Sequence, residues 1–516
     1  MTEHENKLES KDFINIAGKG FTEDYSVADF NAIGASMIGD GSSIDRADWS
    51  IAAGYTYLGQ FIDHDITHTN GEENRNTAQL DLDSLYPKNE NDTTIKDGKF
   101  LLGDHGGSNI GGDLRRDINF HAMIPDHRND ENIIIASIHL TFQKFHNILV
   151  NQGNSFNQAK VIVMDHYHAI VAYDFVRKLT DLNQDQISNI IDRQEKRFIY
   201  TEDMVRMNGG PFIPTEFSGA CYRFGHTMVR SNYDFNDNFS KGTLSKPPLF
   251  FGFPGGRPDF NLVGSDGKPF PTSDARSHKI TSVWVLSGTA TLFEGGKKLQ
   301  SLERFFEKGK NKRNSAGVID TNLSDVMGNL QVSKTAKKDT VLTDIDKFNI
   351  ASRNLQRGQS LGLVSGQEFA QFVKEKSKGK VNPLSDEKIQ EVIENLASRS
   401  EEKISDALKK KLISNTPLWL YTLAEAEAAE VGTGARLGPI ASRCVAEVIL
   451  GLLMDDTMNV DSIRNTSQSR KNAPYNLNEP NEPNKWKSSI IQNKEARDIE
   501  MLDIIKFVNK NHNKVL

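Results

Sequence analysis

The sequence contains little cysteine, no excess of basic residues and no long apolar stretch. Its 516 residues include two cysteines, Cys221 and Cys444, which excludes a disulfide-dense secreted scaffold. One bridge between them is possible, but two free thiols are the favoured interpretation. With 62 basic and 69 acidic side chains the net charge is −7, so we expect no nucleic acid among the partners.

No apolar stretch has the length of a membrane span. The longest, Ala441–Met454, contains Arg443 and Glu447 and is far shorter than the ~20 residues that a spanning helix needs. The first twenty residues contain no apolar stretch of signal-peptide length. We therefore expect a protein without a membrane span that is cytoplasmic or exported by a leaderless route.

The apolar stretches mostly have the length and periodicity of helices. Apolar residues that return every three or four positions predict five helices, over Ile133–Val150, Gln158–Val176, Asp386–Ala397, Arg436–Met454 and Ala496–Val508. Strand-like alternation is scarce, and Ile280–Leu286 is one of few candidates. Between the helices lie long stretches rich in Asn, Asp, Gly and Ser, such as Lys88–Gly98. These features predict a mainly α fold with long irregular loops and little β structure.

The most informative segment, Tyr55–Thr69, reads YTYLGQFIDHDITHT. On a helix, Asp63, His64 and Asp65 would point about 100° apart and address three different partners. His64 and His68 are four residues apart, so they would share a face and could be two ligands of a zinc site. Acid–base catalysis and a merely polar helix end are the other interpretations, and this segment alone does not decide among them.

Two further segments carry acidic residues at short spacing. Asn76–Pro87 places oxygen-bearing side chains at Thr77, Asp81 and Asp83, a ligand type that suits Ca²⁺, although the EF-hand pattern is absent and an ordinary polar loop is the alternative. In PDHRNDEN, Arg128 and Glu131 are three residues apart and would share a face of one helical turn. Alone, such a pair is most often a surface ion pair.

Two later segments complete the set. YRFGHTMVR places His226 after a glycine in apolar surroundings, which taken singly is more often typical of a core histidine than of a ligand. RNLQRGQSLG places Asn354 and Arg357 on one helical face. Each signal is weak when it is taken alone.

Taken in order, GQFIDHD, TxxxDxD, RxxE, RFGHT and RNLQRG resemble the animal-type haem peroxidases of the peroxidase–cyclooxygenase superfamily, and most of all their bacterial branch. The resemblance runs from about Phe21 to Asp456. The length alone suggests about three domains. The resemblance instead implies one large haem peroxidase domain over 21–456, because all these motifs must meet around one haem. A polar segment over 1–20 would precede this domain, and an extension over 457–516 would pack on it.

The resemblance also implies roles for the residues on the peroxide side of the haem. His64 matches the distal histidine, which acts as general base and then acid on hydrogen peroxide. Arg128 matches the distal arginine, which stabilises developing charge. Gln60 matches the distal glutamine, which is associated with a pocket water or halide.

Haem b is the implied cofactor, and further residues match those that hold it. Asp63 and Glu131 match carboxylates that form ester links to the haem. Asn132 stands where a third, methionine link forms in some members, so at most two links are expected.

On the other side of the haem, His226 matches the proximal iron ligand and Asn354 matches the residue that hydrogen-bonds its far nitrogen. Arg223 and Arg357 match arginines that pair with the haem propionates.

Calcium is the second implied cofactor. The resemblance assigns its ligands to one loop and to the helix that carries His64: Asp65, Thr77, Gln79 (through its backbone carbonyl), Asp81 and Asp83. Because His64 and Asp65 are adjacent, the ion would fix the turn that aims the distal base.

The implied activity is reduction of hydrogen peroxide through a ferryl intermediate, with oxidation of halide, thiocyanate or small phenolic donors, as in a response to oxidative stress. Two alternatives stay open: a fatty-acid dioxygenase of the same superfamily, and an inactive haem- and calcium-binding protein. Dioxygenases of the cyclooxygenase type place a tyrosine three residues before the proximal histidine. Here that position is Arg223, with Tyr222 one residue further back, which favours the peroxidase. The zinc interpretation of His64 and His68 is disfavoured.

Overall fold

The computed structural model describes residues 12–18, 20, 24–39, 51–67, 69–70, 73–74, 76–88, 92–104, 110–117, 122–230, 233, 302–307, 314–328, 349–399, 404–428, 434–454 and 488–511. Helices dominate these ranges, which confirms the predicted mainly α fold. The α-helices are α1 (Val27–Ser36), α2 (Gly54–Ile66), α3 (Ile133–Asn151), α4 (Phe156–Ala169), α5 (Arg177–Leu179), α6 (Gln184–Ile191), α7 (Glu202–Asn208), α8 (Thr215–Gly219), α10 (Ile350–Ser360), α11 (Gly366–Lys376), α12 (Asp386–Ser398), α13 (Asp406–Ser414), α14 (Leu418–Ala428), α15 (Pro439–Leu453) and α17 (Met501–Lys510).

Short 3₁₀ turns and strands connect the helices. The 3₁₀ turns are η1 (His127–Asp130), η3 (Cys221–His226), η4 (Leu302–Phe305), η6 (Asp325–Gly328) and η10 (Ala496–Asp498), and η2 (Ile170–Val176) is a π-helix. Strand β1 (Phe13–Ile14) pairs in parallel with β8 (Ile213–Pro214). The antiparallel pairs are β2 (Thr69–Asn70) with β3 (Glu73–Asn74), β4 (Ile95–Lys96) with β5 (Lys99–Phe100), and β6 (Gly103–Asp104) with β7 (Ile110–Asp113).

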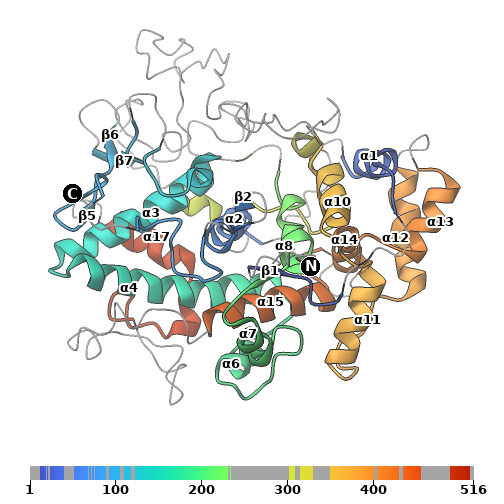
Figure 1. The fold of residues 1–516 in the computed structure, drawn as a ribbon. Coiled ribbons are helices and arrows are strands. Elements are labelled where there is room, and N and C mark those ends of the chain that lie inside the picture. Colours follow the sequence, from blue (N-terminus) through green and yellow to red (C-terminus); the bar gives the residue numbers. More distant parts are fainter. Residues whose placement is uncertain are drawn as a thin grey trace, which may run out of the picture.

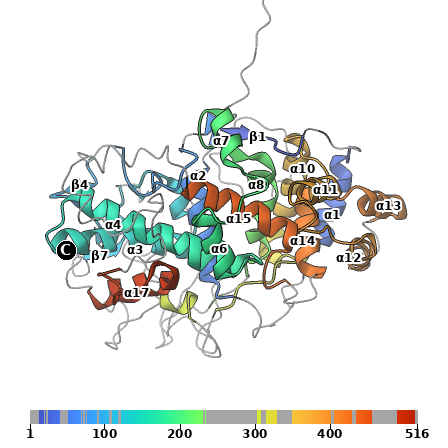
Figure 2. The ribbon, with the colours of Figure 1, turned by 90° about the horizontal axis from the view of Figure 1, so that it is seen from below.

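The helices form two groups joined by α15. Figures 1 and 2 show α3 and α4 side by side at one end, with α17 against them, and α1, α11, α12 and α13 at the other end. The 15-residue α15 runs between these groups and is buried from Ile440 to Leu453. One hydrophobic cluster extends from Tyr25 to Val508 and contains side chains from both groups. Within the described residues, no helix combines the length and apolar character needed to cross a membrane.

Most helices predicted from periodicity are present, with two corrections. The predictions over Ile133–Val150, Asp386–Ala397 and Arg436–Met454 are confirmed by α3, α12 and α15. The predicted helix Gln158–Val176 begins at Phe156 and changes from α to π geometry at Ile170. The prediction over Ala496–Val508 is wrong at its start, because η10 ends at Asp498 and extended residues precede α17.

Local side-chain hydrogen bonds explain where two of these helices begin. The side chain of Asn132 accepts hydrogen bonds from the amides of Ile134 and Ile135, at the start of α3. Ser155 and Gln158 form a reciprocal capping box at the start of α4. These contacts satisfy amides that have no partner inside the helix.

A buried carboxylate joins three helical segments that are distant in sequence. Asp174, on the π-helix, accepts hydrogen bonds from the Tyr55 hydroxyl at 2.9 Å and from the Met501 amide at 2.9 Å, and it also pairs with Lys178. Asp174 has no exposed surface. Because a buried carboxylate is costly unless it is paired, these bonds hold α2 and α17 against the π-helix.

The two cysteines are free and fully buried. The Cys444 thiol hydrogen-bonds Cys221, and burial raises its pKa well above the usual value. The predicted strand Ile280–Leu286 and His68 lie outside the described residues. The domain boundaries near residues 20 and 456 stay predictions.

Candidate active site

Helix α2 carries Gln60 and the sequence Asp63-His64-Asp65, as the predicted helical spacing requires. The three adjacent side chains have three different partners, as expected from their angular separation. Asp63 accepts a hydrogen bond from the Thr67 hydroxyl at 3.1 Å, at the end of the helix. Asp65 belongs to an acidic cluster with Asp81 and Asp83.

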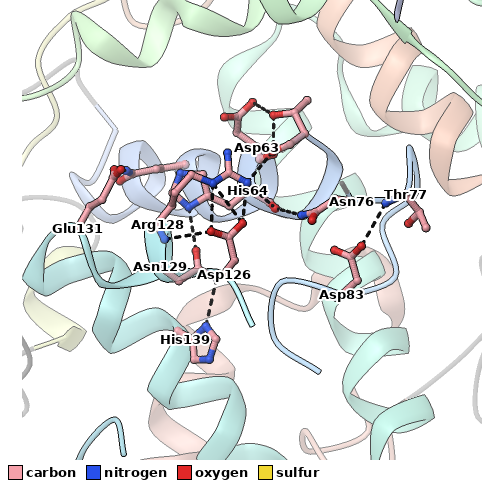
Figure 3. Close-up of polar contacts among 12 residues, drawn as sticks. Asp63, His64, Asn76, Thr77, Asp83, Asp126, Arg128, Asn129, Glu131 and His139 are labelled. Atoms are coloured by element: carbon pink, nitrogen blue, oxygen red, sulfur yellow. Dashed lines mark hydrogen bonds and ion pairs between the residues drawn. The ribbon is translucent and has the colours of Figure 1, made fainter. Parts of the chain in front are cut away.

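His64 is buried and neutral. Burial, together with the nearby charge of Arg128, lowers its pKa to about 4, although Asp63 acts in the opposite direction. Its main-chain carbonyl accepts hydrogen bonds from Asn76 at 2.6 Å and from Arg128 at 3.2 Å (Figure 3). Its ring Nδ1 lies 2.9 Å from Oδ1 of Asn129. The ring and the backbone of His64 are therefore both held by surrounding residues.

Arg128 lies on the 3₁₀ turn η1, where Asp126 is its main partner. The Asp126 carboxylate receives hydrogen bonds from Nε at 3.0 Å and from Nη2 at 2.6 Å. Nη2 also donates to the carbonyl of Thr67 at 2.6 Å. The guanidinium is thus fixed and paired, and Nη1 has no hydrogen-bond partner in the described part of the chain. The ion pair of Arg128 with Glu131, which the sequence allowed as an alternative, is absent among the described residues, and Asp126 is the partner instead.

Glu131 and Gln60 are joined by a hydrogen bond. Gln60 donates from Nε2 to Glu131 at 3.0 Å and accepts at Oε1 from Asn132 at 2.9 Å. Glu131 keeps an exposed edge, but the protein around its carboxyl group raises the pKa to about 7, and the positive charge of Arg128 opposes this shift. Gln60, Glu131 and Asn132 therefore come together although 71 or 72 positions separate Gln60 from the other two.

His226 lies at the end of η3, next to Asn354 of α10. Nδ2 of Asn354 lies 2.7 Å from Nδ1 of His226. Burial and the charges of Arg223 and Arg353 lower the pKa of His226 to about 3. Trp419 of α14 donates to the carbonyl of Arg223 at 3.2 Å and so anchors this turn. The predicted proximity of His226 and Asn354 is confirmed.

Three arginines on η3 and α10 have no ion-pair partner in the described residues, although Arg223 donates hydrogen bonds to the Ser218 carbonyl and to Oδ1 of Asn354. They are Arg223, Arg353 and Arg357. The charges of Arg353 and Arg357 disfavour the charged form of Arg223, and the charge of Arg353 also disfavours that of Arg357. Burial and the Arg357 charge lower the pKa of Arg223 to about 10. Because unpaired guanidinium groups bind carboxylates bidentately, this cluster suits a ligand that carries acidic groups, as haem does.

The segments that carry His64 and His226 face one another. The Tyr222 hydroxyl of η3 donates to the carbonyl of Gly59 in α2, at 3.2 Å. Asp63 of α2 acts electrostatically on Arg223 and Arg357. The structure therefore brings together the segments that the sequence motifs single out.

The predicted calcium ligands form an acidic cluster beside α2. Carboxylate oxygens of Asp65, Asp81 and Asp83 lie within 4.8 Å of one another. Burial, with mutual repulsion, raises the pKa of Asp65, and that of Asp83 to about 7. One buried oxygen each of Asp65 and Asp83 has no hydrogen-bond partner in the described residues.

The remaining predicted ligands lie on the same loop. Thr77 donates hydrogen bonds to Asp81 from its hydroxyl and to Asp83 from its amide. Gln79, which lies between Thr77 and Asp81 in the sequence, is half-buried. A divalent cation would neutralise this charge and use the unpartnered oxygens, so the residues fit Ca²⁺.

Sequence reasoning missed four residues that shape the site: Asp126, Asn129, His139 and Arg353. The first two flank Arg128 in the PDHRNDEN segment, and their positions in that motif were the available signal. His139 lies two helical turns after Asn132 on α3 and has no local sequence signal. Arg353 precedes Asn354 in the RNLQRG motif.

Comparisons with known proteins find a family match to part of the chain and similar folds over most of it. The family model described as animal haem peroxidase matches residues 108–253. This range contains Arg128, Glu131, Arg223 and His226, whereas His64 and Asn354 lie outside it. No curated protein sequence matches the chain.

Solved structures are similar over most of the chain. Peroxidase A from Dictyostelium discoideum matches with a TM-score of 0.52 and 13% identity, covering 90% of this chain and 93% of that one. The fatty acid α-dioxygenase of Oryza sativa matches with a TM-score of 0.55 and 13% identity, over 94% and 78% of the two chains. The fatty acid α-dioxygenase of Arabidopsis thaliana matches with a TM-score of 0.50 and 14% identity, over 92% and 77%.

The chain has the peroxidase–dioxygenase fold. At 13–14% identity these likenesses establish the fold alone. The family-model match covers two turns that contact α2: η1, which carries Arg128, and η3, which carries His226.

Proposed function

We propose that this protein is a haem-dependent peroxidase, which reduces hydrogen peroxide and oxidises a small donor such as halide, thiocyanate or a phenol. The observation that carries the proposal is His64, a buried neutral imidazole whose Nδ1 is hydrogen-bonded and whose Nε2 is left as the reactive nitrogen. Membership of the bacterial branch belongs to this proposal and rests on the sequence motifs alone.

Haem b fits the residues on the His226 side. His226 would hold the iron through Nε2, and Arg223 and Arg357 would pair with the propionates. Bound haem would supply the redox-active iron that passes electrons from donor to peroxide. The Asn354 amide lies against Nδ1 of His226, the ring nitrogen far from the proposed iron position, and this leaves Nε2 available to the iron.

The residues on the His64 side move and stabilise charge. Nε2 of His64 takes the proton from one peroxide oxygen and delivers it to the other, so that water leaves. The low pKa of His64 keeps this nitrogen unprotonated at neutral pH. Nη1 of Arg128 is the donor available to the charge that develops on oxygen, since Nε and Nη2 are engaged elsewhere. Gln60 is held by Glu131 and Asn132 and is suited to position a water or halide.

Asp63 and Glu131 are the carboxylates proposed to form esters with haem. Asn132, which stands in the position of the third link, caps α3 and donates to Gln60, so its side chain is committed to structure. The proposal therefore includes at most two covalent links. Calcium would bind Asp65, Thr77, Gln79, Asp81 and Asp83, and Asn76 of the same loop would transmit its position to the His64 carbonyl.

An ultraviolet–visible titration tests the proposal. The purified protein, supplemented with haem, should show a Soret band that shifts within seconds of adding H₂O₂ and returns when donor is added. Absence of a Soret band would overturn the proposal. A Soret band that ignores peroxide, with oxygen uptake on fatty acid, would establish the dioxygenase instead. A band that responds to neither substrate would identify an inactive haem-binding protein.

A further inference from the structure

A chain of polar contacts leads from His64 into the protein interior. Oδ1 of Asn129, on η1, lies 2.9 Å from Nδ1 of His64. Nδ2 of the same amide lies 3.1 Å from Nδ1 of His139, on α3 (Figure 3). Asn129 and His139 have no exposed surface. The three side chains come from three different elements, so the chain of contacts exists only in the folded protein.

The chemistry of an amide assigns the protons in this chain. The Asn129 oxygen can only accept, so Nδ1 of His64 must carry the ring proton and Nε2 keeps its lone pair. The Asn129 nitrogen can only donate, so Nδ1 of His139 must accept and its proton sits on Nε2. Asn129 therefore sets the tautomer of His64, and His139 holds the Asn129 amide in the orientation that does so.

His139 is held in this place at a cost. Burial lowers its pKa to about 3, so the ring is neutral and serves as an acceptor. Its Nε2 has no hydrogen-bond partner in the described residues. An unpartnered buried polar group destabilises the folded state, and an apolar side chain at this position would avoid that penalty. A role in orienting Asn129 accounts for a histidine here.

The turn η1 holds His64 in two ways. Arg128 donates to the His64 main-chain carbonyl, and the next residue, Asn129, binds the His64 ring. A bidentate contact from Arg116 to Asp130, at 2.7 and 2.9 Å, anchors the same turn. The orientation of the His64 ring is thus set by a turn that is itself anchored.

We propose that Asn129 and His139 are positioning residues for the distal base: they fix the His64 tautomer that leaves Nε2 free to take the peroxide proton. This inference rests on the proposed function, because it assigns His64 the role of base. Neither residue is expected to touch haem or peroxide, and both act through His64.

The experiment compares Asn129→Leu and His139→Phe with matched changes elsewhere on α3. Asn147 and His146 are equally buried on that helix, but they bond to Phe100 and to Gly98 and Tyr86. Asn147→Leu and His146→Phe therefore remove the same groups without altering the contacts of His64. All variants are compared at equal haem content, with two measurements: the rate constant for reaction with H₂O₂, and the cyanide dissociation constant from the Soret shift.

Asn129→Leu should slow the peroxide reaction about 10-fold to 100-fold, as removal of a residue that orients a functional histidine does elsewhere. It should also weaken cyanide binding, because HCN loses its proton to the same nitrogen. Asn129→Asp keeps an acceptor for Nδ1–H and should stay within about threefold of the original rate. His139→Phe should slow the reaction less, and the double variant should match Asn129→Leu alone, because His139 acts only through Asn129.

The outcomes separate this inference from the proposed function. If His64→Ala slows the peroxide step but Asn129→Leu reacts at the original rate, the positioning role is wrong and the peroxidase proposal stands. If His64→Ala leaves the step unchanged, the function itself is wrong. If Asn129→Leu does not fold, His139→Phe decides. An unchanged rate and an unchanged cyanide dissociation constant in that variant would overturn the positioning role. A slowing equal to that of the two control variants would also overturn it.

Discussion

The Tyr222 hydroxyl donates to the main-chain carbonyl of Gly59, 3.2 Å away and 163 positions earlier in the chain. This hydrogen bond ties the turn that ends at His226 to the helix that carries His64. The approach is close at Gly59, where a Cβ atom would lie 3.0 Å from the Phe175 ring. Phe175 belongs to the π-helix, so Gly59 permits the close approach of α2 to that helix, whereas Tyr222 ties together the two histidine-bearing segments.

Replacing Tyr222 with phenylalanine tests whether this tyrosine is structural. The variant should lose about 1 kcal/mol of unfolding free energy, the typical net value of one hydrogen bond, while its ring still stacks on Phe217 at 4.6 Å. Reaction with H₂O₂ should stay within about twofold of the original rate, since the proposed proton transfer does not involve the phenol. Loss of a fatty-acid oxygenation activity in this variant would contradict the peroxidase proposal.

Replacing His64 with alanine should spare the pigment and slow its reaction with peroxide. A positioned general acid–base group contributes about 10²- to 10⁴-fold, so a loss of that size is expected in stopped-flow mixing with H₂O₂. The Soret band before mixing is the control, because the proposal assigns the haem iron to His226 and not to His64. An unchanged rate would show that another group moves the proton.

Replacing His226 with alanine should abolish the Soret band of the haem-supplemented protein, because the ring is the proposed iron ligand. His166→Ala is a matched control: His166 is also buried, but it bonds to Ser488 and the Ile162 carbonyl. That variant should lose stability and keep the pigment. Haem binding that survives in His226→Ala would exclude this residue as the ligand.

Removing calcium should lower thermal stability. The Asp65, Asp81 and Asp83 carboxylates repel one another without an ion. An ion present at 100 times its dissociation constant stabilises the folded state by about 2.7 kcal/mol, so in a chain of this size chelation should lower the melting temperature by about two to three degrees. Asp83→Asn should remove most of this difference. Melting curves that coincide with and without chelator would contradict the assignment.

Glu425 should make stability depend on pH. Its carboxyl group accepts hydrogen bonds from the amides of Ile440 and Ala441, at the start of α15, and burial raises its pKa to about 8. The folded state therefore holds this proton more tightly than the unfolded state, whose pKa is about 4.3. Its contribution is fully present below that value and is lost as pH rises through about 8.

Glu425→Gln keeps an acceptor but does not ionise, so it isolates this effect. Denaturant unfolding of the two proteins should give similar free energies near pH 5. By pH 9 the variant should be more stable than the original chain, by on the order of a few kcal/mol. A difference that does not change between these two pH values would mean that Glu425 does not titrate in this range.

Periodicity predicts helices whose faces are decided by burial alone. The helices α3, α12 and α15 follow their apolar pattern closely. The change to π geometry at Ile170 has no such signal, because the pattern of apolar residues continues unbroken across it. The start of α17 was also missed, since hydrophobic spacing alone does not reveal the extended residues between η10 and α17.

The site residues divide in the same way. Those inside compact motifs, such as His64, Arg128 and His226, are recognisable from the sequence. Asn129 lies within such a motif, yet its role depends on His139, which reaches it from α3. Helical spacing allows a pair of Arg128 with Glu131, but the turn is a 3₁₀ helix in which the Asp126 side chain binds Arg128 instead. Contacts of this kind depend on side-chain directions that spacing does not encode.

The bonds of Asp174 have a consequence for how the protein is made. The Met501 amide that completes this buried carboxylate's partners lies 327 residues further along the chain. During synthesis, α2, the π-helix and the Tyr55 hydroxyl all leave the ribosome long before α17 does. Because a buried carboxylate without its partners is strongly unfavourable, this part of the core stays incomplete through most of translation. The native contacts of Asp174 can therefore be completed only after α17 has emerged.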